Sequence, residues 1–158
     1  MITAHSALAT QILSYDEHVR ALAKNTPTVR RLMTVPGVGP VTALAFVSTI
    51  DDPKRFASAN DVGAYLGLTP RRHQSGEVDR TGRISKHGDR LMRYYLFEAA
   101  NVLLNVVRWG SPLKTWGTKL TRRIGQKKAK VAVARKLAII LHCIWTDGTE
   151  FQWERVAA

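Results

Sequence analysis

Apolar residues recur at helical spacing through the second half of the chain, and this period limits the folds that it can adopt. They share one face in two stretches: Leu91, Tyr95, Ala99, Val102, Leu103 and Val106 after Asp89, and Val131, Ala134, Leu137, Ala138, Leu141 and Trp145 within residues 127–146. Between these stretches, Ser111-Pro112 and Ile124-Gly125 are typical start and stop signals of a further helix. No segment shows the sustained period-two alternation that is typical of strands. The pattern predicts an all-α fold, a helical bundle with few strands.

The first 25 residues predict a separate helix. Its apolar residues are alternately four and three positions apart, which is the seam of two heptads: Leu8, Ile12, Tyr15, Val19 and Leu22. Because two heptads are too short to stand alone, residues 1–25 are expected to be the end of a longer coiled-coil linker. Thr26-Pro27 ends this helix, and residues 26–158 are expected to form the main helical domain.

Helix starts explain the acidic residues of the first half. Asp52 before Pro53 is typical of an N-cap, and Ser58 with Asp61 resembles a capping box. Gly67 is placed to end the helix that starts there. Together with Asp51 these carboxylates could also suggest a metal site, but capping explains them, and no metal is expected in this chain.

Positive charge is concentrated in the second half. The chain has 158 residues and a formal net charge of +12. Residues 71–146 hold 17 Lys or Arg against 4 Asp or Glu, whereas residues 1–70 hold 6 against 5. Such asymmetry is typical of a face that binds a polyanion. A solubilising surface, the alternative, usually mixes both signs along a helix. Nucleic acid is therefore favoured as the partner, well ahead of a membrane surface.

Composition excludes other classes of protein. The single cysteine, Cys143, rules out a disulfide framework and a multi-cysteine zinc site, and its apolar helical context predicts a core thiol. Residues 32–50 carry no charge, but two prolines and two glycines interrupt them, so they predict a turn between helices and no membrane span. Without a signal-peptide pattern, a soluble cytoplasmic protein is expected.

The segment around Val35-Pro36-Gly37-Val38-Gly39-Pro40 resembles a helix-hairpin-helix over about residues 30–50. Gly37 and Gly39 permit positive φ and leave room for a phosphate, and the free N–H groups of the next helix, with Val38 in the turn, would face that phosphate. The alternative is an ordinary turn between core helices. The basic flank favours DNA binding.

Residues 68–88 contain four glycines or prolines and few large apolar groups, which predicts a long basic loop that carries a site. The cations in and after it are Arg71, Arg72, Arg80, Arg83, Lys86, Arg90 and Arg93. Two serine hydroxyls, those of Ser75 and Ser85, lie among them. A serine can attack a phosphodiester if guanidinium groups stabilise the developing charge, but a loop that only grips phosphate is the simpler interpretation. Ser85 is explained as a helix N-cap, whereas Ser75 has no structural explanation.

Three segments, in this order along the chain, resemble the C-terminal domain of the IS110 group of bacterial insertion-sequence transposases: LMTVPGVGPVTALAFVSTID, QSGEVDRTGRISKHGDRLMRYYLFEAA and KKAKVAVARKLAIILHCIW. The resemblance covers about residues 27–146. It implies that Ser75 is the catalytic serine and that Arg80, Arg83 and Lys86 lie near DNA phosphates or the active site. It also implies an N-terminal RNase-H-like domain that binds Mg²⁺ through four acidic residues.

The acidic domain is missing from this sequence, so the chain is expected to be one domain of a longer protein or the product of a truncated gene. The resemblance implies donor and target DNA, a bridge RNA and a second copy of the enzyme as partners, and a bacterial, nucleoid-associated location. Alone, the chain is expected to bind DNA without completing transposition. The alternative is a non-catalytic helix-hairpin-helix module that binds DNA or RNA; a buried or helix-capping Ser75 would favour it.

Overall fold

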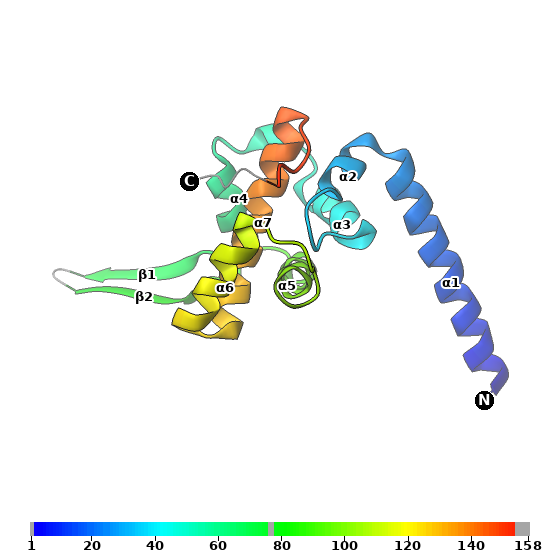
Figure 1. Cartoon of the computed structure of the whole chain (residues 1–158), viewed down its shortest axis with the longest axis horizontal. Helices are drawn as coiled ribbons and strands as arrows, with labels where there is room; N and C mark the ends of the chain where they lie inside the picture. The colour runs from blue at the N-terminus through cyan, green and yellow to red at the C-terminus, as the bar shows by residue number, and fades with distance from the viewer. Residues whose placement is uncertain (1, 76–77, 154–158) are drawn as a thin grey trace.

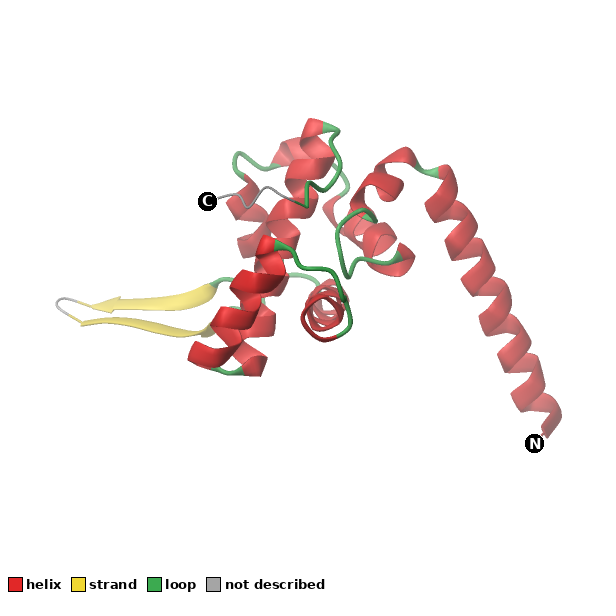
Figure 2. Cartoon of the chain, viewed as in Figure 1, coloured by secondary structure: helices red, strands yellow, loops and turns green. Residues whose placement is uncertain are grey.

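The computed structural model describes residues 2–75 and 78–153, without the side chains of residues 2, 3 and 73–81. The elements, in order, are α1 (Ile2–Asn25), α2 (Pro27–Leu32), α3 (Pro40–Ile50), the 3₁₀-helix η1 (Pro53–Arg55), α4 (Ala59–Tyr65), β1 (Pro70–Ser75), β2 (Val78–Ile84), α5 (Arg90–Asn105), α6 (Pro112–Ile124) and α7 (Gln126–Asp147). Helices predominate in the described chain, which confirms the predicted class (Figure 2).

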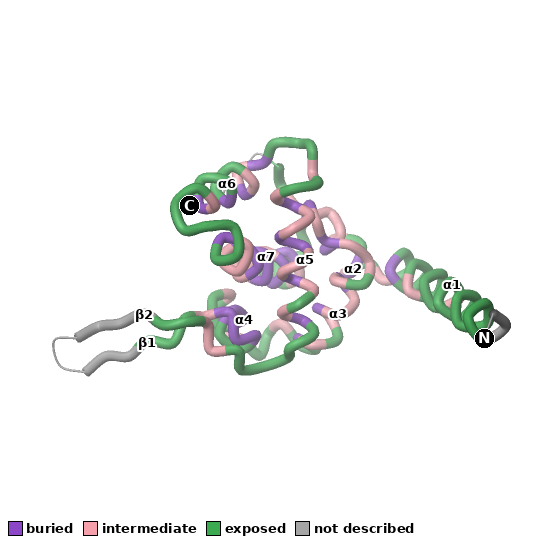
Figure 3. Tube along the Cα trace, turned by 90° about the horizontal axis from the view of Figure 1, so that it is seen from below, coloured by how far each residue is buried: buried purple, intermediate pink, exposed green. Residues whose placement is uncertain are grey.

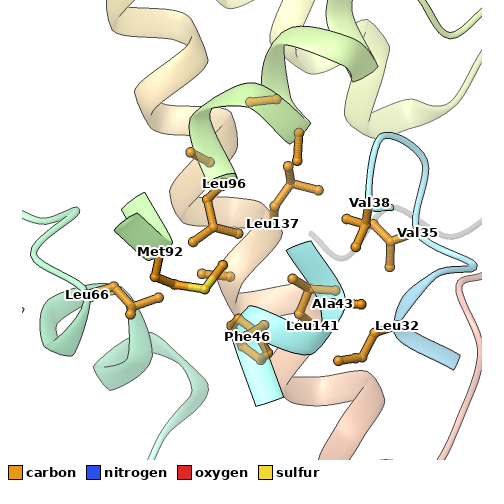
Figure 4. Packing of buried hydrophobic residues seen from close by; sticks show 14 of the residues in the cluster. Leu32, Val35, Val38, Ala43, Phe46, Leu66, Met92, Leu96, Leu137 and Leu141 are labelled. Atoms are coloured by element: carbon orange, nitrogen blue, oxygen red, sulfur yellow. The ribbon is translucent and has the colours of Figure 1, made fainter. Parts of the chain in front are cut away.

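Helix α7 lies at the centre of the bundle and packs against α2, α4, α5 and α6. Its apolar face is the predicted one, because Ala134, Leu137, Ala138 and Leu141 are all buried. Phe46 of α3 and Leu96 of α5 belong to the same buried cluster as this face (Figure 4), with other large side chains labelled there: Leu32, Leu66 and Met92. Each fully buried side chain of this size contributes roughly 1.5–3 kcal/mol to folding.

Side-chain caps begin the helices where the sequence predicts them. The Ser58 hydroxyl accepts from the Asn60 N–H at 3.2 Å, and the Asp61 carboxylate accepts from the Ser58 N–H at 2.9 Å, which confirms the capping box. Asp52 caps η1, and the Ser111 hydroxyl caps α6 by accepting from the Lys114 N–H at 3.1 Å. Proline follows both caps and has no N–H that would need a partner.

The first helix projects from the bundle (Figure 1). It ends at Asn25, as Thr26-Pro27 predicts. Its heptad residues are largely uncovered, because Leu8, Ile12, Tyr15 and Leu22 are each at least 58% exposed, and Figure 3 shows α1 almost entirely as exposed surface. That this seam belongs to a coiled coil stays a prediction.

Residues 68–88 do not form the irregular loop that was expected. They form an antiparallel β-hairpin in which Arg72 pairs with Thr81, His73 with Arg80, Gln74 with Asp79 and Ser75 with Val78. The hairpin projects from the bundle on the side away from α1 (Figure 1). Strand pairing gives the main-chain N–H and C=O groups partners that a loop would leave to water.

At the base of this hairpin two segments, residues 65–69 and 85–88, cross and are hydrogen-bonded to each other. The Ser85 N–H donates to the Thr69 carbonyl at 2.8 Å, and the Lys86 N–H donates to the Gly67 carbonyl at 3.0 Å. The two glycines at the crossing both have positive φ: a Cβ at Gly67 would lie 1.9 Å from the His87 oxygen, and one at Gly88 would lie 2.1 Å from the Tyr65 oxygen. Only glycine permits so close an approach of two backbones.

Replacing Gly67 by alanine is therefore expected to lower the free energy of unfolding by at least about 2 kcal/mol, because the Cβ both meets backbone and strains a left-handed φ. Urea unfolding followed by circular dichroism measures this. Gly110→Ala is the matched control, since a Cβ there has no neighbour within 4 Å, and it should change stability little. A Gly67→Ala variant as stable as the parent would show that the segments do not cross this closely.

Candidate nucleic-acid interface

The guanidinium of Arg93 holds the base of the hairpin in place. Its Nη1 donates to the carbonyls of His87 at 2.9 Å, Gly88 at 3.0 Å and Leu66 at 3.3 Å. These carbonyls belong to both crossing segments, so one side chain from α5 ties them together. Arg93 was also expected to contact DNA, and that contact stays a prediction beside these contacts of its Nη1 inside the protein.

The other described cations of the hairpin and its base are exposed: Arg71, Arg72, Arg83, Lys86 and Arg90. The Nη2 of Arg71 also donates to the Ser85 carbonyl at 3.1 Å, which fixes that side chain along the hairpin. Lys86 has a φ of +59°, which strains a residue other than glycine and fixes the turn toward α5. The described part of the hairpin and its base therefore present exposed positive charge.

The two candidate serines differ in position. Ser75 is the last residue of β1, at the end of the hairpin that lies away from the bundle (Figure 1). Its main chain is in register with Val78, while its side chain and that of Arg80 lie outside the described residues. Ser85 does not cap a helix, contrary to the prediction: Asp89 caps α5, and its carboxylate accepts from the Met92 N–H.

The turn between α2 and α3 lies apart from the hairpin, on the α1 side of α5 in Figure 1. A helix stands on each side of it, as expected. Gly37 has a φ of +89°, but a Cβ there would lie 2.4 Å from the Ala99 oxygen, so this glycine approaches α5. Val38 is buried, at 6% exposed. Only Gly39 faces open space, since a Cβ there has no neighbour within 4 Å.

A second basic surface surrounds the turn between α6 and α7. Five exposed cations belong to it: Lys119, Arg122, Arg123, Lys127 and Lys128. This α6–α7 turn and the hairpin lie on the same side of the bundle in both Figure 1 and Figure 3. The predicted site residues did not include these five, although the run of ten basic residues without an acid between Glu98 and Asp147 was their signal.

The described residues show neither a reactive thiol nor a cluster of metal-binding side chains. Cys143 is exposed, which corrects the expected core thiol, and partial burial together with Asp147 raises its pKa above the usual value. A thiol with a raised pKa is protonated at neutral pH and is a poor nucleophile. Among the side chains that the structure describes, no three of His, Cys, Asp or Glu gather where a metal ion could bind. In the same part of the chain, no helix is long and apolar enough to cross a membrane.

The chain is similar in sequence to a family of transposases. Residues 29–114, which include the α2–α3 turn, the hairpin and α5, match the family described as Transposase IS116/IS110/IS902. The chain is 35% identical, over 84% of its length, to the transposase for insertion sequence element IS1111A of Coxiella burnetii, and 32% identical, over 91%, to that for IS1328 of Yersinia enterocolitica. It is 31% identical, over 89%, to the pilin gene-inverting protein of Moraxella bovis. It spans 36 to 45% of the length of these relatives.

Proposed function

The chain belongs to the IS116/IS110/IS902 transposase family, whose model matches more than half of it, and we propose that it is the DNA-binding and strand-cleaving part of such an enzyme. The observation that carries this proposal is the arrangement of charge: the projecting hairpin and the α6–α7 turn both lie on the side of the bundle away from α1, and both carry exposed cations. Two such surfaces can neutralise phosphates along one duplex.

Ser75 is the proposed nucleophile. Its Oγ attacks a DNA phosphorus, so that a serine–phosphate ester forms and the bond from phosphorus to one deoxyribose oxygen breaks. The hydroxyl proton passes to a base, and the departing deoxyribose oxygen takes up a proton. A hydroxyl of a second DNA strand then reverses the step and joins the strands without net loss of a phosphodiester. Arg80 and Arg83, on the neighbouring strand, are the groups proposed to stabilise charge on the transferring phosphoryl group.

Mg²⁺ is proposed to belong to a partner domain. The acidic residues Asp52, Asp61 and Asp89 of this chain cap helices, so their carboxylates are engaged and do not converge. We propose that the hairpin carries Ser75 into the metal site of an RNase-H-like domain, which its projection from the bundle would permit. A bridge RNA and a second copy of the enzyme are further partners that we propose from the family resemblance.

The alternative, a non-catalytic helix-hairpin-helix module, would place DNA on the α2–α3 turn. That turn is packed against α5 through Gly37 and Val38 and offers only Gly39 to a phosphate. The main chain of Ser75 belongs to a strand, at the end of β1. We therefore retain the transposase domain as the proposed function.

Salt dependence of DNA binding tests this function. If the two basic surfaces neutralise about six phosphates, log K should fall with log salt at a slope near −5. Replacing Arg122, Arg123, Lys127 and Lys128 by alanine should make that slope shallower by about 3 to 4. Arg20→Ala with Lys24→Ala, both exposed on α1, is the matched control and should leave the slope unchanged. A parent slope shallower than about −2 would contradict the proposal.

A further inference from the structure

A cavity opens where the base of the hairpin meets α5 and α7. Its volume is about 540 Å³, within the range that small-ligand sites occupy. Ile84 of β2, Phe97 of α5 and Val131 of α7 are among its apolar walls. Lys86, Arg90 and Tyr94 line it as well. The cavity therefore lies between the base of the hairpin, which carries Lys86, and α5, which carries Arg90.

The charge of this cavity is one-sided. Lys86, Arg90 and Arg93 line it, and among the residues whose side chains the structure describes no acidic one does. Arg93 is engaged with three main-chain carbonyls, whereas Lys86 and Arg90 are exposed. An anion at the opening would therefore meet the exposed side chains of Lys86 and Arg90, which lie beside the engaged guanidinium of Arg93.

An aromatic surface accompanies these cations. Tyr94 is 57% exposed although its ring is large and mostly apolar. Phe97 lies one helical turn further along the same face of α5, and the Lys130 ammonium lies 5.7 Å from its ring centroid. Flat apolar rings beside cations are what a nucleotide requires, because its base stacks on a ring and its phosphate takes the positive charge.

We propose that this cavity receives one unpaired nucleotide of the bound DNA strand, with the base against Tyr94 and the phosphate between Lys86 and Arg90. The proposal rests on the proposed function, which brings DNA to this side of the bundle. A paired base is stacked inside the duplex and cannot enter, so the nucleotide must be extrahelical. Strand transfer requires strands to separate, and this cavity would hold a base that has left its stack.

The test uses three short duplexes: one fully paired, one with a single bulged adenine and one with a bulged abasic site. The two bulged duplexes carry the same number of phosphates, because the abasic site keeps the phosphate and lacks only the base. The 158-residue chain should bind the bulged adenine at least about fivefold more tightly than the abasic bulge. This ratio should persist as salt is raised, although each affinity falls, because stacking carries no counterion release.

Tyr94→Ala should reduce that ratio to one, and Tyr94→Phe, which keeps the ring, should preserve it. Trp109→Ala removes an aromatic side chain that is 74% exposed and lines no part of this cavity, so it should leave the ratio unchanged. Equal affinity of the parent for the adenine and abasic bulges, or a preference that survives Tyr94→Ala, overturns the cavity proposal while DNA binding stands. A preference found only with RNA versions of the duplexes overturns the assignment to DNA. Failure to bind any of the three DNAs overturns the proposed function as well.

Discussion

Strand transfer is expected to be lost when Ser75 is changed to alanine in an enzyme reconstituted from this chain and an RNase-H-like partner domain. The Oγ of Ser75 forms the bond to phosphorus in the proposed reaction, so no neighbouring group replaces it. The rate should fall by more than about a thousandfold, as it does when a covalent nucleophile is removed. DNA binding should persist, because the basic surfaces carry it. Joined product and binding are measured on the same preparation.

Ser85→Ala is the matched control for that experiment. The main chain of Ser85 makes its contacts, since its N–H donates to Thr69 and its carbonyl accepts from Arg71, and alanine keeps both. Because Asp89 is the cap of α5, loss of the Ser85 hydroxyl should not destabilise that helix. Strand transfer should continue in this variant. If Ser75→Ala and Ser85→Ala lost activity equally, the experiment would not support Ser75 as the nucleophile.

Gly37→Ala is expected to have a large effect on stability. Its Cβ would lie 2.4 Å from the Ala99 oxygen and 3.1 Å from the Leu103 nitrogen, and the φ of +89° is strained for alanine. Backbone of α5 cannot yield as a flexible side chain would, so the free energy of unfolding should fall by about 2–4 kcal/mol. Urea unfolding measures the loss. Unchanged stability would mean that the α2–α3 turn is not seated on α5 as described.

The Gly39→Ala variant tests whether the α2–α3 turn contacts DNA phosphate, because it leaves the packing of this turn unchanged. A Cβ at Gly37 would meet the backbone of α5, whereas a Cβ at Gly39 has no neighbour within 4 Å. The Gly39→Ala variant should unfold like the parent. Weaker DNA binding in this folded variant would assign a phosphate contact to the turn, and unchanged binding would make it a purely structural turn.

Sequence patterns predicted the helices well because local chemistry determines their ends. The start of α6 at Pro112 and its end at Ile124 follow from a serine cap, a proline and a glycine, each of which acts within a few residues. The buried face of α7 follows in the same way from apolar spacing. Helix α5 ends at Asn105, before the apolar spacing itself ends at Val106.

The hairpin could not be found by the same reasoning. Strands are recognised by apolar residues on one face, but β1 reads PRRHQS and β2 reads VDRTGRI, so both faces are polar. Gly76-Glu77 between them was the available signal, because a glycine followed by any residue is favoured in two-residue hairpin connections. The interaction that orients the hairpin is the long-range contact of Arg93 with three carbonyls, which no local pattern encodes.

The identity of the nucleophile is most directly tested by mapping a covalent protein–DNA adduct. The reconstituted enzyme is trapped with cleaved DNA, digested with trypsin and analysed by mass spectrometry. Cleavage after Arg72 and Arg80 gives a peptide of residues 73–80 that holds Ser75 alone, while cleavage after Arg83 and Lys86 gives residues 84–86, which hold Ser85 alone. We expect the nucleotide mass on residues 73–80. An adduct on residues 84–86, or joined DNA formed without any serine adduct, would contradict the account.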